Sequence, residues 1–359
     1  MKDGRSIQDL AAELARQADA KQDYLVDTRG LHMDTDTQVS IENHGKHPLT
    51  PHAHRQIGDR LGIPAKYYDK MRDEAPDLLA DNVNHWFEQD PESRLVRTMD
   101  GRIRAFLSDR YRPLENIDLA KTVLPVLQDA EAEIASCEIT ERRFYLKAIL
   151  PGNHVEIGPP GFEWGKGHDQ IDVVEPGIVI SNSEIGSGAL AACPAIHTIR
   201  CSNLAVWSDA SYRKFHIGEK LANAGDGDIW KYLTDETKSL TDAAIWNQVG
   251  DMVQQALVGE MFYDIVDELR KARNEPIEGD PVKAVEVVAK TNHMTDDEGS
   301  SILRHLIQGG DLTQYGMHNA VTRASADVES YDRASELESI GAKVIQLEDN
   351  QWQAIAQAT

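Results

Sequence analysis

The sequence predicts an α+β fold, with a mainly antiparallel central sheet flanked by helices and a helical C-terminal third. Asp100-Gly101 has the residue types of a two-residue type I′ turn, in which both central residues need positive φ, and its flanks are rich in strand formers. Strand-like segments recur up to about residue 200, whereas apolar residues follow a helical spacing from about residue 203. Runs of strands joined without helical crossovers are typical of antiparallel sheets.

Residues 1–90 are expected to form a mostly helical N-terminal unit. Ser6 can cap the first helix, and Thr50 followed by Pro51 is a combination typical of a helix start. The elements expected in this unit are helices over 6–20 and 50–61, a helix that starts at Pro64, a helix over about 77–89, and a short strand over 37–42.

Residues 91–220 are expected to form the antiparallel sheet core, which includes the arginine-rich hairpin around Asp100-Gly101. Because side chains alternate between the two faces of a strand, Arg102 and Arg104 should share one exposed face. The expected elements are a hairpin over 93–108, a helix over 116–128, strands over 132–139, 143–150, 177–183 and 188–200, and a long loop over 151–170 that serves function or oligomer contact.

Residues 221–345 are expected to form a helical region packed on the core, followed by a C-terminal tail over 346–359. Thr295 and Glu298 have the spacing of a capping box at a helix start. The expected elements are helices over 235–273, 282–290, 296–308, 315–326 and 329–339, and one last strand over 343–347.

The composition is that of a globular protein, with 41% hydrophobic and 27% charged residues. No apolar run approaches the ~18 residues of a membrane span. Three cysteines do not suggest a disulfide framework, and the N-terminus lacks a signal peptide's apolar core, so we expect a cytoplasmic protein. The net charge is −23, and residues 221–359 alone hold 25 acidic and 11 basic residues. Such a field disfavours indiscriminate binding of duplex DNA but permits a local anion-binding groove.

Residues 94–112 contain six arginines and only two acidic residues. The planar guanidinium group grips phosphate at two points, so this segment suggests a nucleic-acid backbone contact, with tyrosines available for base stacking. The alternative is a solvated face whose arginines pair with nearby acids. The expected interface consists of Arg94, Arg97, Arg102, Arg104, Arg110, Arg112, Arg142, Arg143, Lys147, Tyr111 and Tyr145.

A second concentration of polar residues lies between 180 and 218, at the ends of apolar strands, where functional sites are often built. The alternative is that these asparagines cap turns, which is their commonest use. The candidate pocket consists of Asn182, Ser183, Arg200, Asn203, Arg213, Lys214 and His216.

The sequence predicts neither a metal nor a cofactor, and it identifies no catalytic residue. Phosphate-loop, nucleophile-elbow, HExxH and CxxC motifs are all absent. Cys193, His197 and Cys201 are four residues apart, but on a strand this spacing is about 13 Å, too far for ligands of one zinc ion.

Several segments of the chain resemble the domain-of-unknown-function 932 family, also called phage/plasmid-like proteins. The resemblance implies a bacterial mobile-element protein linked to DNA recombination and replication, and by analogy a relation to ring-forming single-strand annealing proteins. Where the family commonly has histidine, aspartate and glycine after the asparagine–serine pair, this chain has Glu184, Ile185 and Gly186. The resemblance spans roughly 90–345 and rests on FLSDRYRPLENIDL at 106–119, ISNSEIGSG at 180–188, IRCSNLAV at 199–206, His216, and NAVTR at 319–323.

Three functional hypotheses follow from these observations. The first is a homo-oligomeric phage- or plasmid-type protein that binds or anneals single-stranded DNA in the bacterial cytoplasm. The second is an enzyme that acts on a nucleotide or nucleic acid in the candidate pocket. The third is an interaction protein that counters a host defence, with its acidic C-terminal third mimicking DNA. Salt dependence of DNA binding separates the first from the third, and metal- or nucleotide-dependent turnover identifies the second.

Overall fold

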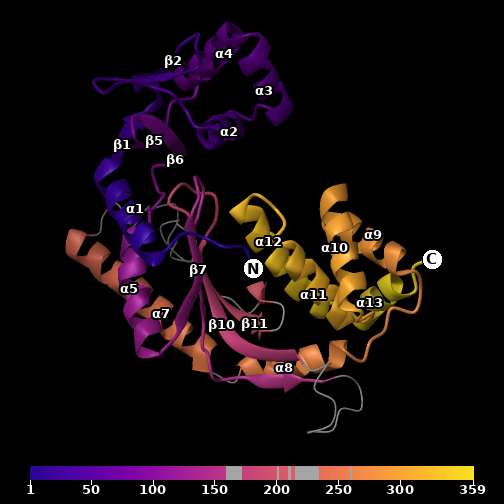
Figure 1. Ribbon diagram of the computed structural model, residues 1–359. Coiled ribbons are helices and arrows are strands. Elements are labelled where there is room, and N and C mark those ends of the chain that lie inside the picture. The colour runs from indigo at the N-terminus through magenta and orange to yellow at the C-terminus, as the bar shows by residue number, and fades with distance from the viewer. Residues whose placement is uncertain (159–171, 200–201, 209–211, 215–233, 259–260) are drawn as a thin grey trace, which may run out of the picture.

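An antiparallel sheet lies at the centre of the structure, with helices on both of its faces (Figure 1). The computed structural model describes residues 1–158, 172–199, 202–208, 212–214, 234–258 and 261–359. Every ladder between the described strands is antiparallel, and helices follow one another through the C-terminal region, which confirms the predicted α+β class.

The central sheet has the strand order β12-β11-β10-β8-β7, with β13 paired to β11 and β9 paired to β10. The β10–β11 hairpin is its longest ladder, and it places Ser181 opposite Ala191 at the turn end and Val174 opposite Thr198 at the far end. The strands are β7 (Glu133–Ile139), β8 (Phe144–Ile149), β9 (Val155–Ile157), β10 (Asp172–Asn182), β11 (Leu190–Thr198), β12 (Asn203–Val206) and β13 (Tyr212–Lys214).

Alternation along these strands gives the sheet two different faces. Leu146, Ile178 and Ala192 are buried on the face covered by α1 (Ile7–Ala20), α5 (Asn116–Asp129) and α7 (Asp235–Val258). Tyr145 and Val179, their neighbours in sequence, lie on the opposite face, over which α12 (Tyr331–Ile345) passes. A cavity lies along this second face.

The N-terminal unit has a core of its own, and it contains the arginine-rich hairpin. Val96, Ile103 and Phe106 pack with the apolar residues of α2–α4, and seven residues of β1 pair with β5. The sequence predicted that the hairpin would be part of the central sheet, and this is wrong. The hairpin belongs to the N-terminal unit, because β1, a strand that the sequence did not predict, pairs with β5. The elements are β1 (Lys21–Asp27), η1 (Thr28–Gly30), β2 (Leu31–Met33), β3 (Val39–Ile41), β4 (Gly45–His47), α2 (Pro51–Arg60), α3 (Ala65–Glu74), α4 (Pro76–Gln89), β5 (Ser93–Met99) and β6 (Arg102–Ser108).

The C-terminal region is helical to its end. The segment expected to be a tail forms a helix whose Trp352 and Ile355 are buried, and residues 343–345, expected to begin a strand, end α12. The segment expected as one helix over 235–273 contains α7 and α8, with residues 259–260 between them outside the described part. The remaining helices are α8 (Met261–Ala272), α9 (Pro281–Thr291), α10 (Asp296–Gly309), α11 (Gln314–Ala324) and α13 (Asp349–Ala356). Among the described helices, none combines the length and the hydrophobicity needed to cross a membrane.

Candidate functional site

The arginine-rich hairpin forms as predicted, but a β-bulge changes where its arginines point. Asp100 and Gly101 both have positive φ, 52° and 74°, as the type I′ turn requires. Thr98 pairs with Ile103 while Arg97 pairs with Ala105, so Arg104 is the extra residue of the bulge. Arg102 is exposed but Arg104 is only 7% exposed. The expectation that the two arginines share an exposed face is therefore wrong, because the bulge interrupts the alternation.

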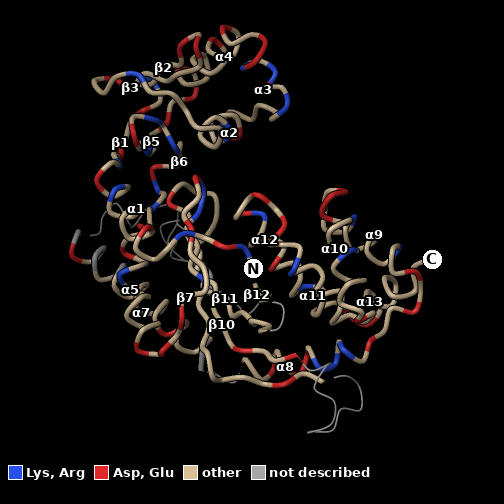
Figure 2. The backbone as a smooth tube through the Cα atoms, viewed as in Figure 1, with Lys and Arg blue, Asp and Glu red and all other residues tan. Residues whose placement is uncertain are grey.

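Buried ion pairs hold the inward-pointing arginines of the hairpin. Arg97 is 2% exposed, and its guanidinium donates to Asp23 at 2.8 Å, to Glu115 at 2.6 Å and to the Glu184 carbonyl at 2.8 Å. Arg104 donates to the Glu184 carboxylate at 3.0 Å. Figure 2 shows acidic residues beside the basic ones through this part of the chain. Arg97 and Arg104 therefore pair with acids, as the alternative to a nucleic-acid contact predicted. The acids are not the nearby ones that this alternative expected, because they lie far away in the sequence.

Glu184 is the centre of this buried network, which we call the Glu184 cluster (Lys21, Arg97, Arg104, Glu115 and Glu184). Its carboxylate accepts from Lys21 at 3.0 Å and from the backbone N–H of Asn116 at 2.8 Å, in addition to Arg104. Burial alone would raise the pKa of Glu115, but the positive charges of Arg97 and Lys21 lower it to about 2. The cluster joins the N-terminal unit to the turn between β10 and β11.

The polar residues of that turn also have structural roles. Asn182 is buried and donates to the Leu114 carbonyl at 2.7 Å and to Asn116 at 2.8 Å. The Ser183 hydroxyl donates to the Arg142 carbonyl at 2.9 Å, and the Tyr111 hydroxyl donates to the Ser183 carbonyl at 3.0 Å. These side chains fix the turn against its neighbours, so Tyr111 is engaged internally and is not a free stacking platform.

The candidate pocket predicted around Asn182 and Asn203 does not form. Asn203 pairs opposite Thr198, which lies opposite Val174, whereas Asn182 ends the same strand β10 eight residues later. At ~3.3 Å per residue the two asparagines are about 26 Å apart, at opposite ends of the sheet. The physical reason is the β10–β11 hairpin. Asn182 lies at its turn end, whereas β11 runs away from the turn and leads to Asn203 at the far end. Asn203 is buried and donates to the Asn319 carbonyl at 3.1 Å.

The remaining predicted residues fall into three groups. Arg94 forms an ion pair with Glu92 and lies 5.3 Å over the Phe106 ring, while Arg110 is exposed and Arg112 is half-buried. Arg200 and His216 lie outside the described residues. Arg213 and Lys214 belong to β13, for which only the backbone is described. Arg213 pairs opposite Ala191, and Lys214 pairs opposite Leu190.

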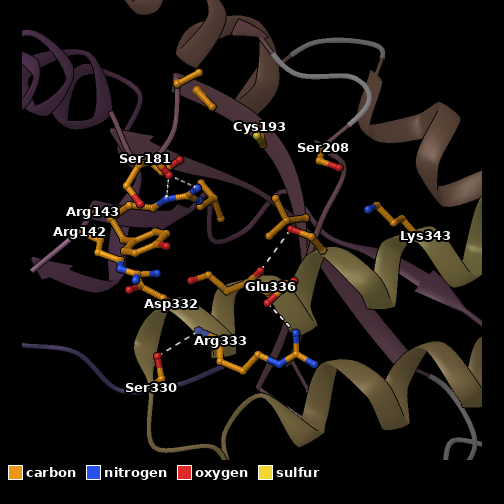
Figure 3. A pocket seen from close by; sticks show the side chains of 18 residues that line it. Arg142, Arg143, Ser181, Cys193, Ser208, Ser330, Asp332, Arg333, Glu336 and Lys343 are labelled. Atoms are coloured by element: carbon orange, nitrogen blue, oxygen red, sulfur yellow. Dashed lines mark hydrogen bonds and ion pairs between the residues drawn. The ribbon is translucent and has the colours of Figure 1, made fainter. Parts of the chain in front are cut away.

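A cavity of about 830 Å³ lies between the second face of the central sheet and α12 (Figure 3). We call it the sheet–α12 cavity. It brings together Arg142, Arg143 and Tyr145, which sequence analysis had placed in one interface, with residues of α12 that it had not considered. Its lining consists of Arg142, Arg143, Tyr145, Val179, Ser181, Ser187, Ala189, Ala191, Cys193, Val206, Ser208, Ser330, Asp332, Arg333, Ser335, Glu336, Ser339 and Lys343.

The charge of this lining is opposite in sign to that of the whole chain. Four cationic side chains face two carboxylates, Asp332 and Glu336, which gives a net charge of +2 in a chain of net charge −23. Arg333 is neutralised by Glu298 at 2.6 Å and by Glu336 at 2.6 Å. Arg142 and Lys343 are exposed and form no ion pair with the part of the chain that the structure describes. These two cations are therefore available to an anionic ligand.

Arg143 is fixed at one end of the cavity by the backbone. Its guanidinium donates to the Ser187 carbonyl at 3.0 and 2.5 Å. Gly188 permits this position, because a Cβ atom there would lie 2.7 Å from the guanidinium. Asp332 is fixed at the same end, since the Thr140 hydroxyl contacts its carboxylate at 3.2 Å. This end of the cavity is therefore preorganised before any ligand arrives.

A buried ion pair ties the sheet to α12 beside the cavity. Lys147 and Glu338 are both fully buried, with 2.6 Å between the Lys147 Nζ and the Glu338 carboxylate, and Lys147 lies 4.6 Å over the Tyr331 ring. Lys147 was expected to contact nucleic acid, and its burial makes that expectation wrong, because it lies on the sheet face that α12 covers. Tyr145 is 3% exposed, so its ring is not available as an open stacking surface.

The residues that sequence analysis missed lie along α12. Asp332, Glu336, Ser339 and Lys343 follow one another at helical spacing and form a polar stripe on that helix. This stripe was readable in the sequence, but its position over the second face of the sheet was not. In the described ranges, no three His, Cys, Asp or Glu side chains are grouped so that they could hold a metal ion.

No protein-family model matches the chain, and neither a curated protein nor a solved structure matches it.

Proposed function

We propose that the protein binds single-stranded nucleic acid in the sheet–α12 cavity, as a phage- or plasmid-type protein that acts in recombination or replication in the bacterial cytoplasm. The mobile-element setting is supported by the resemblance of residues 106–119 and 180–188 to the family named above. The contact is supported by the cavity, and it differs from the arginine hairpin that the sequence favoured.

The observation that carries this proposal is the local reversal of charge. A chain with 60 acidic and 37 basic residues repels phosphate at long range. A cavity lined by four cations in such a chain indicates a local site for an anion. Arg142 and Lys343 lack carboxylate partners in the described structure, and the cavity adds serine hydroxyls that donate to phosphate oxygens. Guanidinium, ammonium and hydroxyl donors are the groups with which proteins contact nucleic-acid backbones.

The size of the cavity favours a single strand over a duplex. Its volume of about 830 Å³ falls among pockets that hold small ligands, which span ~300–1,000 Å³. A few unpaired nucleotides fit such a space, whereas a double helix does not. Arg97 and Arg104 are engaged in the Glu184 cluster, so the exposed arginines of residues 94–112 are Arg102 in the hairpin and Arg110 just after it.

An enzyme that acts on a nucleotide or nucleic acid is the second candidate, and one observation favours it. Asp332 and Glu336 place two carboxylates in a cavity that otherwise suits phosphate. A carboxylate near a bound phosphate ester is a candidate general base. Release of product from a radiolabelled oligonucleotide, lost in Asp332→Asn, would favour this candidate over simple binding.

The direct test is fluorescence anisotropy of a labelled single-stranded oligonucleotide, measured from 50 mM salt upwards. We expect Arg142→Ala and Lys343→Ala to weaken binding, and each lost phosphate contact to flatten the salt dependence by about 0.7. Arg102→Ala and Arg110→Ala are matched controls, because both residues are exposed arginines outside the cavity.

Two results would overturn the proposal. Absence of binding by the folded wild-type protein at 50 mM salt would reject nucleic-acid binding altogether. Binding that survives Arg142→Ala and Lys343→Ala but is lost in Arg102→Ala or Arg110→Ala would move the contact to the hairpin and reject the cavity.

A further inference from the structure

Apart from Arg333, which Glu298 and Glu336 neutralise, the cations of the sheet–α12 cavity lie in two separate groups. Arg142 and Arg143 come from the turn before β8, close to the start of α12, as the contact between Thr140 and Asp332 shows. Lys343 lies eleven residues after Asp332 on α12, which is about 16 Å along the helix at ~1.5 Å per residue. In Figure 3, Arg142 and Arg143 are on one side of the cavity, and Lys343 with Ser208 is on the other.

The space between the two cationic groups has a different character. Glu336 contributes a carboxylate on the helix side, and Ser335 and Ser339 contribute hydroxyls. Carboxylates repel phosphate and accept hydrogen bonds, so this middle zone favours hydroxyl or amino donors of a ligand. Val179 adds an apolar patch on the sheet side.

We infer that the ligand of this cavity carries two anionic groups, one for each cationic end, with hydrogen-bond donors between them. Within the proposed function, on which this inference rests, such a ligand is a short oligonucleotide segment whose successive phosphates reach both Arg142 and Lys343. Asp332, which lies at the Arg142 end, and Lys343 are about 16 Å apart along α12, several times the ~3 Å over which one phosphate forms hydrogen bonds. We therefore expect successive phosphates, and not a single one, to contact the two ends. A mononucleotide would therefore occupy only the Arg142 end, where Arg143 and Asp332 are held in place.

The test is a series of 5′-phosphorylated thymidine oligonucleotides with one, two, three and four phosphates, each competing against the labelled oligonucleotide at 50 mM salt. We expect a step in affinity of about tenfold or more at the length that first reaches Lys343, since a charge-assisted hydrogen bond is worth about that factor. Lys343→Ala should remove the step and leave the affinity for the single-phosphate ligand unchanged. Arg142→Ala should weaken every member of the series.

Two variants serve as controls. Lys343→Arg keeps the charge and should keep the step. Lys290→Ala removes an exposed lysine on α9, outside the cavity lining, and should change nothing. Equal affinity for all four lengths in the wild type would overturn the inference, and so would a Lys343→Ala protein that loses affinity equally for every length. Both outcomes leave oligonucleotide binding intact, so they are distinct from failure of the proposed function, in which no oligonucleotide binds.

Discussion

Replacing Arg104 by alanine should destabilise the fold, whereas replacing Arg102, two residues away, should not. Arg104 donates to the Glu184 carboxylate at 3.0 Å, and the two side chains are 8% and 1% exposed. The other carboxylate oxygen keeps Lys21 and the Asn116 N–H, so the loss is one charge-assisted hydrogen bond, worth about 1.5–3 kcal/mol. Burial of both partners puts the expected cost near the upper end of that range. Arg102 is exposed, and Arg102→Ala should change stability by less than about 0.5 kcal/mol.

The measurement is the free energy of unfolding from urea denaturation, with Arg104→Ala and Arg102→Ala compared under identical conditions. A double-mutant cycle with Glu184→Gln tests whether the destabilisation comes from the Arg104–Glu184 ion pair. Arg104→Ala should lower the free energy of unfolding less when the carboxylate charge is already absent. A stabilising Arg104–Glu184 pair would be refuted if the free energies of unfolding of the two single variants differed by less than about 0.5 kcal/mol. It would also be refuted if Arg104→Ala cost the same with Glu184 and with Gln at position 184.

Three further outcomes are expected. Lys147→Met and Glu338→Leu should each cost about 3–5 kcal/mol, because each leaves a buried charge unpaired, and the double variant should recover most of that loss in urea denaturation. Burial lowers the pKa of His318 to about 4, so stability should fall as the pH drops from about 6.5 towards 4, where the unfolded chain takes up a proton that the folded one does not, and His318→Gln should flatten this slope. Gly188→Ala should weaken oligonucleotide binding severalfold without changing the circular dichroism spectrum, because the new Cβ displaces the Arg143 guanidinium; unchanged affinity would show that Arg143 does not contact the ligand.

Elements with strong local signals were predictable from the sequence. The helix start at Thr50-Pro51, the capping box at Thr295 and the Asp100-Gly101 turn all form as expected, because side chains within four residues determine each of them. The strand β1 was missed, since four of its seven residues are exposed and its sequence, KQDYLVD, lacks a clear apolar alternation. Its pairing with β5 supplies the stabilisation that local sequence does not.

The candidate site was less predictable, because its residues meet only through tertiary structure. Arg142 and Arg143 were recognised as candidates, but their partners on α12 are about 190 positions away in the chain. Period-two alternation placed Arg104 on the wrong face, since a single bulged residue reverses the direction of its side chain. The number of arginines in a segment does not predict which of them point to solvent.

Whether an arginine is available to a ligand depends on which acidic residues the fold places beside it. The acid nearest to Arg97 in sequence is Asp100, yet Arg97 pairs with Asp23 and Glu115, because β1 and the residue before α5 both lie beside β5. Arg97 and Arg104 are buried against carboxylates where the N-terminal unit meets the turn between β10 and β11, so their charges are not available to a ligand. Arg142 and Lys343 are exposed and form no ion pair within the described residues, although Asp332 and Glu336 line the same cavity. Unpaired cations that share a concave surface are therefore a stronger indication of anion binding in this protein than the density of arginine along its sequence.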